Sequence, residues 1–462
     1  MSAHSGSDGW AAVAALGALA GAVAWGCGSQ QAATGNPQPT VSSAAGANGI
    51  LEAAGAAGVA GALGVGGAAG ADVGSLVELP QQLAWSYPSA DAPRSCMTMV
   101  TLDSVIPPAV TADAGVDGAD AGAVVPPDEE LPTGAVGFDA GVVERDPRPA
   151  APRLLSQTGC FAEIAQHQVS EEFVPYLLRS PLWTDGAHKD RFFSIPPGTS
   201  IAVTVDGIWL WPVGAVLIKN FSFDFQGPNG VERRPVETRV MKRFPNGRWH
   251  YWSYQWNEEG TDAVLLEGSL EKYLTVVNQA QPLRYVYPSQ LSCRTCHGFG
   301  TEGVLGPTAI QLDMEVSSQG TVRQQLDVLT ELGIVEHQEL AVSGLVDPAN
   351  ETATIEARAR SYLHGNCAHC HQPGGYAPAD VHMDLRITTP LEDAELCGAA
   401  VDYASEQAQV RIAPGSPENS ELWLRFTTDG LSRMPMIGTG LHDPLGEALI
   451  RQWIESIERC PQ

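Results

Sequence analysis

Two short segments carry residues whose types and spacing could bind a cofactor. Residues 293–297 read Cys-Arg-Thr-Cys-His, residues 367–371 read Cys-Ala-His-Cys-His, and both segments fit C-x-x-C-H. Two residues between the cysteines let both sulfurs reach the vinyl groups of one porphyrin, and the next histidine then lies beneath the iron. The pattern predicts two covalently bound haem c groups, with attachment and proximal iron ligation by Cys293, Cys296, Cys367, Cys370, His297 and His371.

Three other kinds of site use similar residues. A thioredoxin-like redox dithiol needs a βαβ context, which the surrounding sequence lacks. A zinc site could take its four ligands from the two cysteine pairs, and the same cysteines could form disulfides. In either case the histidine after each second cysteine would be a coincidence that occurs twice, so haem is the favoured interpretation.

The second motif lies between two predicted helices. Helical spacing of apolar residues over 351–363 leads into it, and an amphipathic helix follows Asp443 and Pro444, which suit its N-cap and first position. Between them lies Arg433-Met434-Pro435-Met436. This order resembles a class I cytochrome c, in which the methionine before proline is the distal iron ligand. The resemblance implies Met434 as the distal ligand of the second haem, with Met436 as the fallback and simple packing as the remaining alternative.

The first motif has no Met-Pro loop between His297 and Asn350. A vacant sixth position would leave the iron of the first haem open to small molecules. We assign no sixth ligand here, because each candidate residue alone is more often structural. The candidates are Met314, His337, His364, His250 and Met241.

Residues 154–288 show the alternation and the aromatic, β-branched runs that are typical of strands. Asn246-Gly247 between two such runs predicts a hairpin, because both residues tolerate positive φ. Six of the 11 tryptophans lie here, and they predict either the core of a β-sandwich or an aromatic platform for a flat ligand. The core is the favoured interpretation.

The pattern changes to helix and loop from about residue 289, and residues 321–332 are also spaced as a helix. We therefore expect a first haem segment at 289–350 and a cytochrome c domain with the second haem at 351–462. The predicted fold is multidomain, with an all-β, sandwich-like domain followed by an all-α, cytochrome c-like haem region. A disordered N-terminal third precedes both.

The N-terminal third predicts export. An apolar run over 11–25 fits a signal peptide at 1–27, although no basic residue precedes it. Ala24-Trp25-Gly26-Cys27 resembles a lipoprotein signal, so lipidation of Cys27 and plain secretion both stay open. Residues 28–153 are mostly Ala, Gly and Pro-rich and predict a disordered tether. Within it, residues 76–101 could form a short ordered patch or a strand added to the main body.

Four cysteines belong neither to the motifs nor to the signal, and an oxidising compartment would allow them three pairings. A bridge between the last two is favoured, since both lie in the C-terminal domain, and four unpaired buried thiols are the alternative. The four are Cys96, Cys160, Cys397 and Cys460.

The chain has 53 Asp and Glu against 26 Lys and Arg, for a net charge of −27. An acidic surface repels nucleic acid and anionic membranes, and it suits a basic redox partner, although a merely solvated surface explains it as well. The redox partner stays unknown.

Residues 154–460 resemble an uncharacterised bacterial family of diheme c-type cytochromes. The resemblance implies electron transfer in the periplasm or cell envelope, either free or lipid-anchored to the outer membrane. A diheme redox enzyme, peroxidase-like with an open first haem, is the alternative, and a β domain that binds a carbohydrate or partner is a third. The family match rests on the two motifs and on the segments 180–187, 212–219, 237–241 and 256–262.

Overall fold

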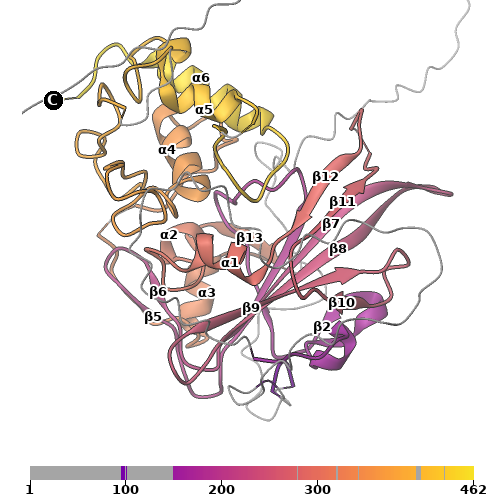
Figure 1. Ribbon diagram of the computed structural model, residues 1–462. Helices are drawn as coiled ribbons and strands as arrows, with labels where there is room; N and C mark the ends of the chain where they lie inside the picture. The colour runs from indigo at the N-terminus through magenta and orange to yellow at the C-terminus, as the bar shows by residue number, and fades with distance from the viewer. Residues whose placement is uncertain are drawn as a thin grey trace, which may run out of the picture. The chain divides into compact units, whose positions relative to one another are not determined.

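The computed structural model describes residues 95–98, 100, 149–277, 279–318, 321–341, 343–401, 407–430 and 432–461. The predicted signal at 1–27 and nearly all of the predicted tether at 28–153 lie outside these residues. The described part is a sheet-rich region followed by helices (Figure 1), which confirms the coarse order of the predicted fold.

The sheet-rich region is built on one antiparallel sheet. Within the described residues this sheet has six strands in the order β10-β9-β8-β7-β4-β3. Its middle strands alternate polar and apolar residues, as expected for a strand with two different faces. The bounds are β3 Val174–Pro175, β4 His188–Ser194, β7 Val216–Gly227, β8 Gly230–Arg243, β9 Trp249–Trp256 and β10 Ala263–Leu265.

The predicted hairpin is confirmed, since β8 and β9 pair on either side of residues 244–248. Gly247 has a φ of 80°, which glycine adopts without steric cost. Asn246 does not adopt a positive φ. Its Oδ1 instead accepts a hydrogen bond from the Arg248 amide at 3.0 Å, a usual role for asparagine in a turn.

The two faces of the sheet pack against different parts of the chain. One face carries Phe192, Ile218 and Trp252 and is covered by the N-terminal segments, including η1 (Leu155–Thr158), β1 (Phe161–Glu163), η2 (Ile164–Gln166) and β2 (Gln168–Val169). We call it the rear face. The other, the front face, carries Phe193 and Leu217 and is covered by β5 (Ala202–Val203), β6 (Trp209–Leu210), α2 (Ala309–Leu312) and α3 (Gln325–Glu331).

The expected sandwich takes a different form in the described residues, because each face is covered by short ribbons and helices, and no second large sheet is present. Four of the six tryptophans expected in the core are buried, namely Trp209, Trp211, Trp252 and Trp256. This burial supports the core interpretation over an aromatic platform. A further ribbon, β11 (Leu270–Leu274) with β12 (Leu283–Tyr287), packs on the far end of β7 and β8.

The helix predicted over 321–332 begins later than expected. Residues Thr321–Gln324 form β14, which pairs with β13 (Glu315–Ser318), and α3 starts only at Gln325. Thr321 and Val322 are β-branched, and pairing with the preceding strand overrides their weak helical periodicity.

The C-terminal helices surround their own apolar core. They are α4 (Ile355–Asn366), η3 (Pro417–Asn419), α5 (Glu421–Thr427) and α6 (Pro444–Ser456). Asp443 caps α6 as predicted, with its carboxylate 3.1 Å from the Leu445 amide. The Tyr362 hydroxyl of α4 donates to the same carboxylate at 2.8 Å, so the cap also joins the two helices.

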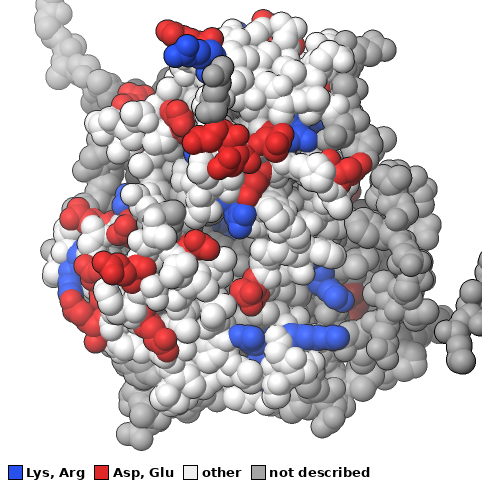
Figure 2. All heavy atoms as spheres, turned by 90° about the vertical axis from the view of Figure 1, so that its left-hand side faces the viewer, with Lys and Arg blue, Asp and Glu red and all other residues white. Residues whose placement is uncertain are grey.

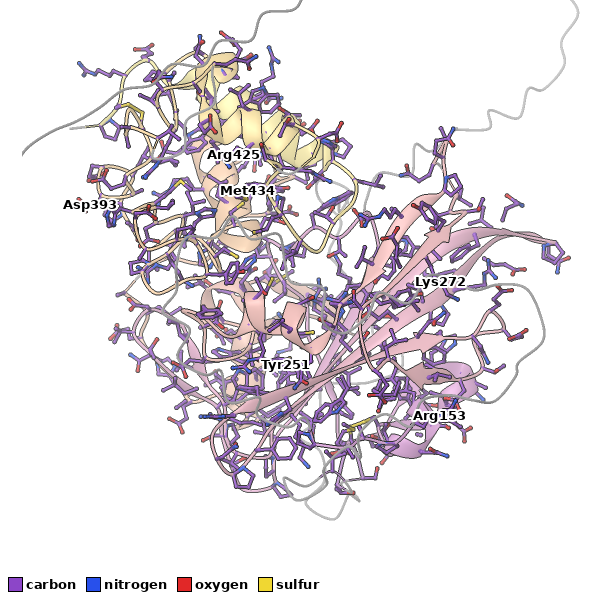
Figure 3. All side chains as sticks on the ribbon, in the orientation of Figure 1. Arg153, Tyr251, Lys272, Asp393, Arg425 and Met434 are labelled. Atoms are coloured by element: carbon purple, nitrogen blue, oxygen red, sulfur yellow. A yellow bond between two sulfur atoms is a disulfide. The ribbon has the colours of Figure 1, made fainter. Side chains whose placement is uncertain are left out.

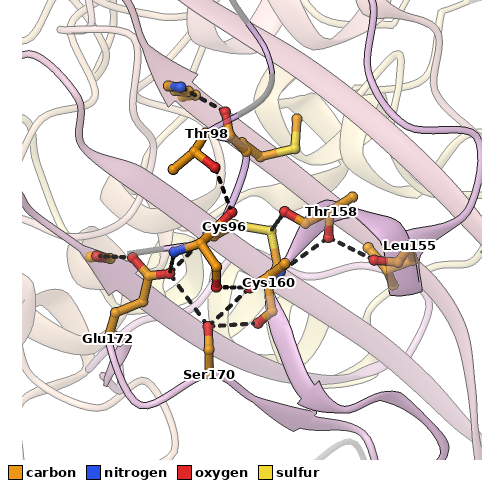
Figure 4. Close-up of a disulfide and its surroundings, with 12 residues drawn as sticks. Cys96, Thr98, Leu155, Thr158, Cys160, Ser170 and Glu172 are labelled. Carbon is orange, nitrogen blue, oxygen red and sulfur yellow. Dashed lines mark hydrogen bonds between the residues drawn. A yellow bond between two sulfur atoms is a disulfide. The ribbon is translucent and has the colours of Figure 1, made fainter. Parts of the chain in front are cut away.

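Two disulfides fix the described chain. Cys397 and Cys460 are bonded, which confirms the favoured pairing, and Cys96 is bonded to Cys160 (Figure 4). The buried Glu172 carboxylate accepts from the Ser95 and Cys96 amides at 3.1 and 3.0 Å. Residues 95–98 are thus held on the rear face as a turn, not as the added strand that the sequence left open.

No helix among the described residues is both long and apolar enough to cross a bilayer.

Candidate functional site

The first motif lies on α1 (Gln290–His297), which packs on β9 at the front face. Ser289 caps this helix, because its hydroxyl accepts from the Ser292 amide at 3.2 Å. Residues three and four apart share one side of a helix, so α1 presents Cys293, Cys296 and His297 together.

His297 is held in one orientation by its surroundings. Its Nδ1 lies 3.2 Å from the Gly303 carbonyl, and its ring stands 5.2 Å from the ring of Tyr251, whose hydroxyl donates to the same carbonyl at 3.1 Å. A proton on Nδ1 leaves Nε2 as the metal-binding atom. Burial, with a further contribution from the charge of Lys219, lowers the pKa of His297 to about 3, so the imidazole is neutral, as a ligand must be.

The second motif begins where α4 ends. Cys367 is the C-cap residue, and its carbonyl accepts from the Cys370 and His371 amides at 3.1 and 3.0 Å, which makes a compact turn of the motif. Burial, and then the charges of His369, Arg411 and Arg425, lower the pKa of His371 to about 4. Its buried Nδ1 has no hydrogen-bond partner among the described residues.

The structure brings the two motifs together. The Cys370 thiol forms a hydrogen bond with Cys296, which lowers the pKa of Cys296 and raises that of Cys370. Beside this contact, the Gln372 amide donates to the Gly300 carbonyl at 3.0 Å, and the rings of Phe299 and Tyr376 lie 5.6 Å apart. Two segments that are distant in the chain therefore form one site.

Met434 lies in the loop between α5 and α6 (Figure 3). Its amide donates to the Arg425 carbonyl at 2.8 Å, which ties it to the helix whose arginine also acts on His371. Met434 is half-buried, whereas Met436 is 56% exposed. If one of the two sulfurs is a ligand, the exposures favour Met434 over Met436.

A loop of the sheet-rich region, residues 180–185, holds both the second motif and the methionine loop. The Ser180 hydroxyl donates to the Ser361 carbonyl at 2.8 Å, and Asn366, the last residue of α4, accepts from the Trp183 amide at 2.7 Å. The Asp185 carboxylate accepts from Thr439 Oγ1 and from the amides of residues 440 and 441 at 2.6, 2.8 and 2.7 Å. We call residues 180–185 the clamp loop.

Sequence reasoning missed the role of Asp185. Its partners are 254 to 256 residues away in the chain, so no local pattern could reveal them. Asp185 has a positive φ of 52°, and the signals in the sequence were its place before Gly186 and inside segment 180–187, on which the family resemblance partly rests.

The candidates for a sixth ligand of the first haem lie in different places. His250 points to the rear face, with its ring 5.0 Å from that of Phe244, whereas its neighbour Tyr251 points to the front, where His297 lies. His337 is exposed, and Met314 packs with Val316 and Leu177.

The two other candidates are held near the site. His364 Nδ1 accepts from the Ile387 amide at 3.2 Å. Met241 pairs with Tyr251 across β8 and β9, so it shares the front face. Because neighbouring residues of a strand point to opposite faces, His250 points away from His297 and is disfavoured as a ligand. The sixth ligand of the first haem stays unassigned.

A cavity of about 520 Å³ borders the first motif and is lined by His297 but by neither cysteine of the motif. It is open to solvent, and cationic and aromatic side chains dominate its wall. Its lining includes Arg243, Arg248, Trp249, Tyr251, Arg294 and His297.

The donor set fits two haem c groups. Among the described cysteines, the four of the motifs carry free thiols and the other four form disulfides. In the same residues no three His, Cys, Asp or Glu side chains gather as a metal-binding group. A haem site needs no such group, since the porphyrin supplies four of the ligands to iron and the protein one or two.

No family model, curated protein or solved structure matches the chain. The resemblance to diheme cytochromes and to class I cytochrome c therefore rests on the residues of the chain alone.

Proposed function

We propose that this protein is an exported diheme c-type cytochrome that acts in electron transfer. Two covalent haem c groups would be held by the two C-x-x-C-H motifs, with His297 and His371 as proximal ligands and Met434 as the distal ligand of the second haem. When bound, each haem supplies an iron that gains and loses one electron.

The observation that carries this proposal is the contact between the motifs. Cys293 and Cys367 are 74 positions apart in the chain, yet the Cys296 and Cys370 side chains are in hydrogen-bond contact. Two adjacent points of attachment support electron exchange between the two cofactors. A four-cysteine zinc site would also bring the two pairs together, but among the described residues no three His, Cys, Asp or Glu side chains gather as a metal-binding group.

The chain contributes groups that favour a stable redox site. The carbonyl of Gly303 fixes His297, burial keeps both histidines neutral, and the clamp loop holds the methionine loop against the helical core. A fixed ligand set reduces the rearrangement that accompanies a change in iron charge, and such positioning is the part of the task that the protein performs.

Two observations support a location outside the cytoplasm and a basic partner. Disulfides such as Cys96–Cys160 and Cys397–Cys460 persist in oxidising compartments, in line with the signal expected at 1–27. Figure 2 shows a face on which acidic side chains outnumber basic ones, and exposed carboxylates there suit a cationic redox partner. Anchoring through a lipidated Cys27 to the outer membrane belongs to the same proposal.

A count of haem per chain tests the proposal. The full chain is produced in a periplasm with haem attachment, and a pyridine haemochrome assay is expected to give about two haems per chain that resist acidified acetone. The double variant Cys293→Ser/Cys296→Ser and the double variant Cys367→Ser/Cys370→Ser should each retain one haem. The matched control Cys397→Ser/Cys460→Ser removes two cysteines elsewhere and should retain both.

A colourless wild-type protein, or pigment that acidified acetone extracts, would contradict the proposal. Equal haem loss in the Cys397→Ser/Cys460→Ser control would show that cysteine removal acts through the fold and not through attachment.

No sixth ligand is assigned to the first haem, which leaves a second candidate, a diheme redox enzyme of the peroxidase type with an open first haem. Such an enzyme would have one high-spin iron, and its reduced form would bind carbon monoxide. Low-spin spectra for both irons, with no response to carbon monoxide or peroxide, would exclude the enzyme and leave the electron carrier.

A further inference from the structure

The front face of the sheet carries a row of cationic side chains beneath the first motif. Arg191 of β4 pairs with Lys219 of β7, and Lys219 pairs with Arg239 of β8, so three cations stand side by side on adjacent strands. Lys189 lies two residues before Arg191 on the same face. We call Arg191, Lys219 and Arg239 the cation row.

The cation row acts directly on the motif. The charge of Lys219 acts on Cys296 and on His297, and the charge of Arg239 acts on Cys293. Tyr251, in the next row of the sheet, contacts the His297 ring. The front face thus presents positive charge beside the first motif.

Carboxylates of the chain balance only part of this charge. Glu237 is fully buried and accepts two bonds from Arg239 at 2.8 Å, so it compensates that arginine, and it also accepts from the Ser253 and Tyr285 hydroxyls. The Lys189 Nζ donates to the Leu182 carbonyl at 2.6 Å, and the charge of the Asp185 carboxylate acts on it.

Neither Arg191 nor Lys219 forms an ion pair with a carboxylate among the described residues, although the charge of Glu237 also acts on Lys219. Arg191 is 6% exposed, its Nη1 donates only to the Lys189 carbonyl at 3.2 Å, and its buried Nε has no partner in the described part of the chain. The Lys219 Nζ makes no hydrogen bond there either and stands 5.5 Å from the centre of the Phe221 ring. Burial, and then the charges of Arg191 and Arg239, lower the pKa of Lys219 well below its usual value. Asp190, beside Arg191 in β4, points to the rear face.

Such an arrangement is unfavourable by itself. Like charges opposite each other on adjacent strands repel, and a buried cation without a counter-ion loses its hydration without compensation. The chain as a whole has an excess of acidic residues, so a general shortage of carboxylates does not explain the row. Its geometry calls for an anion from outside the polypeptide.

We propose that Arg191 and Lys219 form a carboxylate-binding site that anchors the propionates of the first haem. This inference rests on the proposed function. A guanidinium beside an ammonium is a suitable pair of donors for a carboxylate. Haem bears two propionates, and a haem tethered by thioether bonds to α1 presents them at high effective concentration, which favours them over a free anion.

The test compares variants of Lys219 in the holoprotein. Lys219→Met removes the charge and keeps the length, Lys219→Arg keeps the charge, and Lys272→Met removes a lysine of β11 that lies away from both motifs (Figure 3). A redox titration followed by absorption separates the two haems. The reduction step that changes the sulfur-to-iron band is assigned to the second haem, and the other step to the first.

Lys219→Met is expected to lower the reduction equilibrium constant of the first haem at least tenfold, or ~59 mV for one electron. The propionate bending vibration of the first haem should also shift in the resonance Raman spectrum of Lys219→Met. In Lys219→Arg and Lys272→Met, the potential and this vibration should stay near their wild-type values. Arg191→Met should act in the same direction as Lys219→Met. Far-UV circular dichroism and a haem count of two select the folded, loaded variants.

The outcomes separate the two proposals. Wild-type protein without covalent haem would overturn the proposed function. Protein with two haems whose first potential and propionate vibration are unchanged in Lys219→Met would overturn only the propionate anchor. A wild-type potential that titrates with added acetate would assign the cation row to a free anion and would also overturn the anchor.

Discussion

At the scale of single residues, the two methionines of the loop before α6 make a matched pair. Met434→Ala should abolish the sulfur-to-iron absorption band, because the methionine sulfur is lost. The haem count should be unchanged, because the bonds between the motif cysteines and the haem remain. Met436→Ala, at a position that is 56% exposed, should keep the band. A band that persists in Met434→Ala and disappears in Met436→Ala would reverse the assignment.

His364 should make the stability of the protein depend on pH. Burial lowers its pKa from 6.5 to about 4, so the unfolded chain binds a proton more readily than the folded one, and stability falls as pH falls below about 6.5. His364→Asn can still accept from the Ile387 amide but does not titrate. Between about pH 7.5 and about pH 4.5, wild type should lose about 2 kcal/mol more than His364→Asn in its free energy of unfolding.

Denaturant titrations of the holoprotein at several pH values measure this difference. Parallel curves for wild type and His364→Asn would show that the His364 imidazole does not titrate in this range, as expected if it were bound to iron.

At the scale of elements, the clamp loop links the sheet-rich region to both parts of the second site. Asp185→Ala removes an acceptor shared by three donors of residues 439–441, so the methionine loop should loosen and the sulfur-to-iron band should weaken or vanish. Asp185→Asn keeps an oxygen acceptor and should retain most of the band. The haem count should be unchanged in both variants, since neither touches the motifs.

Absorption spectra at increasing temperature follow the band in each variant. Equal band stability in Asp185→Ala and wild type would mean that the loop is held by other contacts.

The sequence predicted the features that depend on neighbouring residues and missed those that depend on contacts between distant segments. The motifs, the strands β7 to β9 and the Asp443 cap of α6 follow from neighbouring residues, and the structure contains each of these strands and the cap. No periodicity encodes pairings between distant segments. Such pairings produce the contact between Cys296 and Cys370, the cation row, and the hydrogen bonds from residues 439–441 to Asp185. At residues 321–324, pairing with β13 favours a strand over the helix that the local pattern predicts.

At the scale of the whole molecule, the two disulfides close long loops of similar length. Their cysteines are 64 and 63 positions apart, and closing a loop of this size removes unfolded-state entropy worth about 4 kcal/mol in the chain-entropy model. Cys397→Ser/Cys460→Ser should lower the free energy of unfolding by about 3 kcal/mol at constant haem content. Reduced wild-type protein should be less stable than Cys397→Ser/Cys460→Ser, because it lacks both bridges.

Guanidinium titrations with and without reductant make this comparison. If the reductant has no effect on wild type, the bridges do not contribute to stability in solution.

The rear face also determines how the molecule can be attached to a support. Cys96 is bonded to Cys160 on the rear face, and the Pro149 carbonyl accepts from the rear-face Trp252 indole at 3.2 Å. α1 and the first motif lie on the opposite face. A protein attached to an electrode at Ser95 would turn its rear face to the surface. A soluble mediator should then reach the front face, where the first haem is proposed, without competition from the electrode.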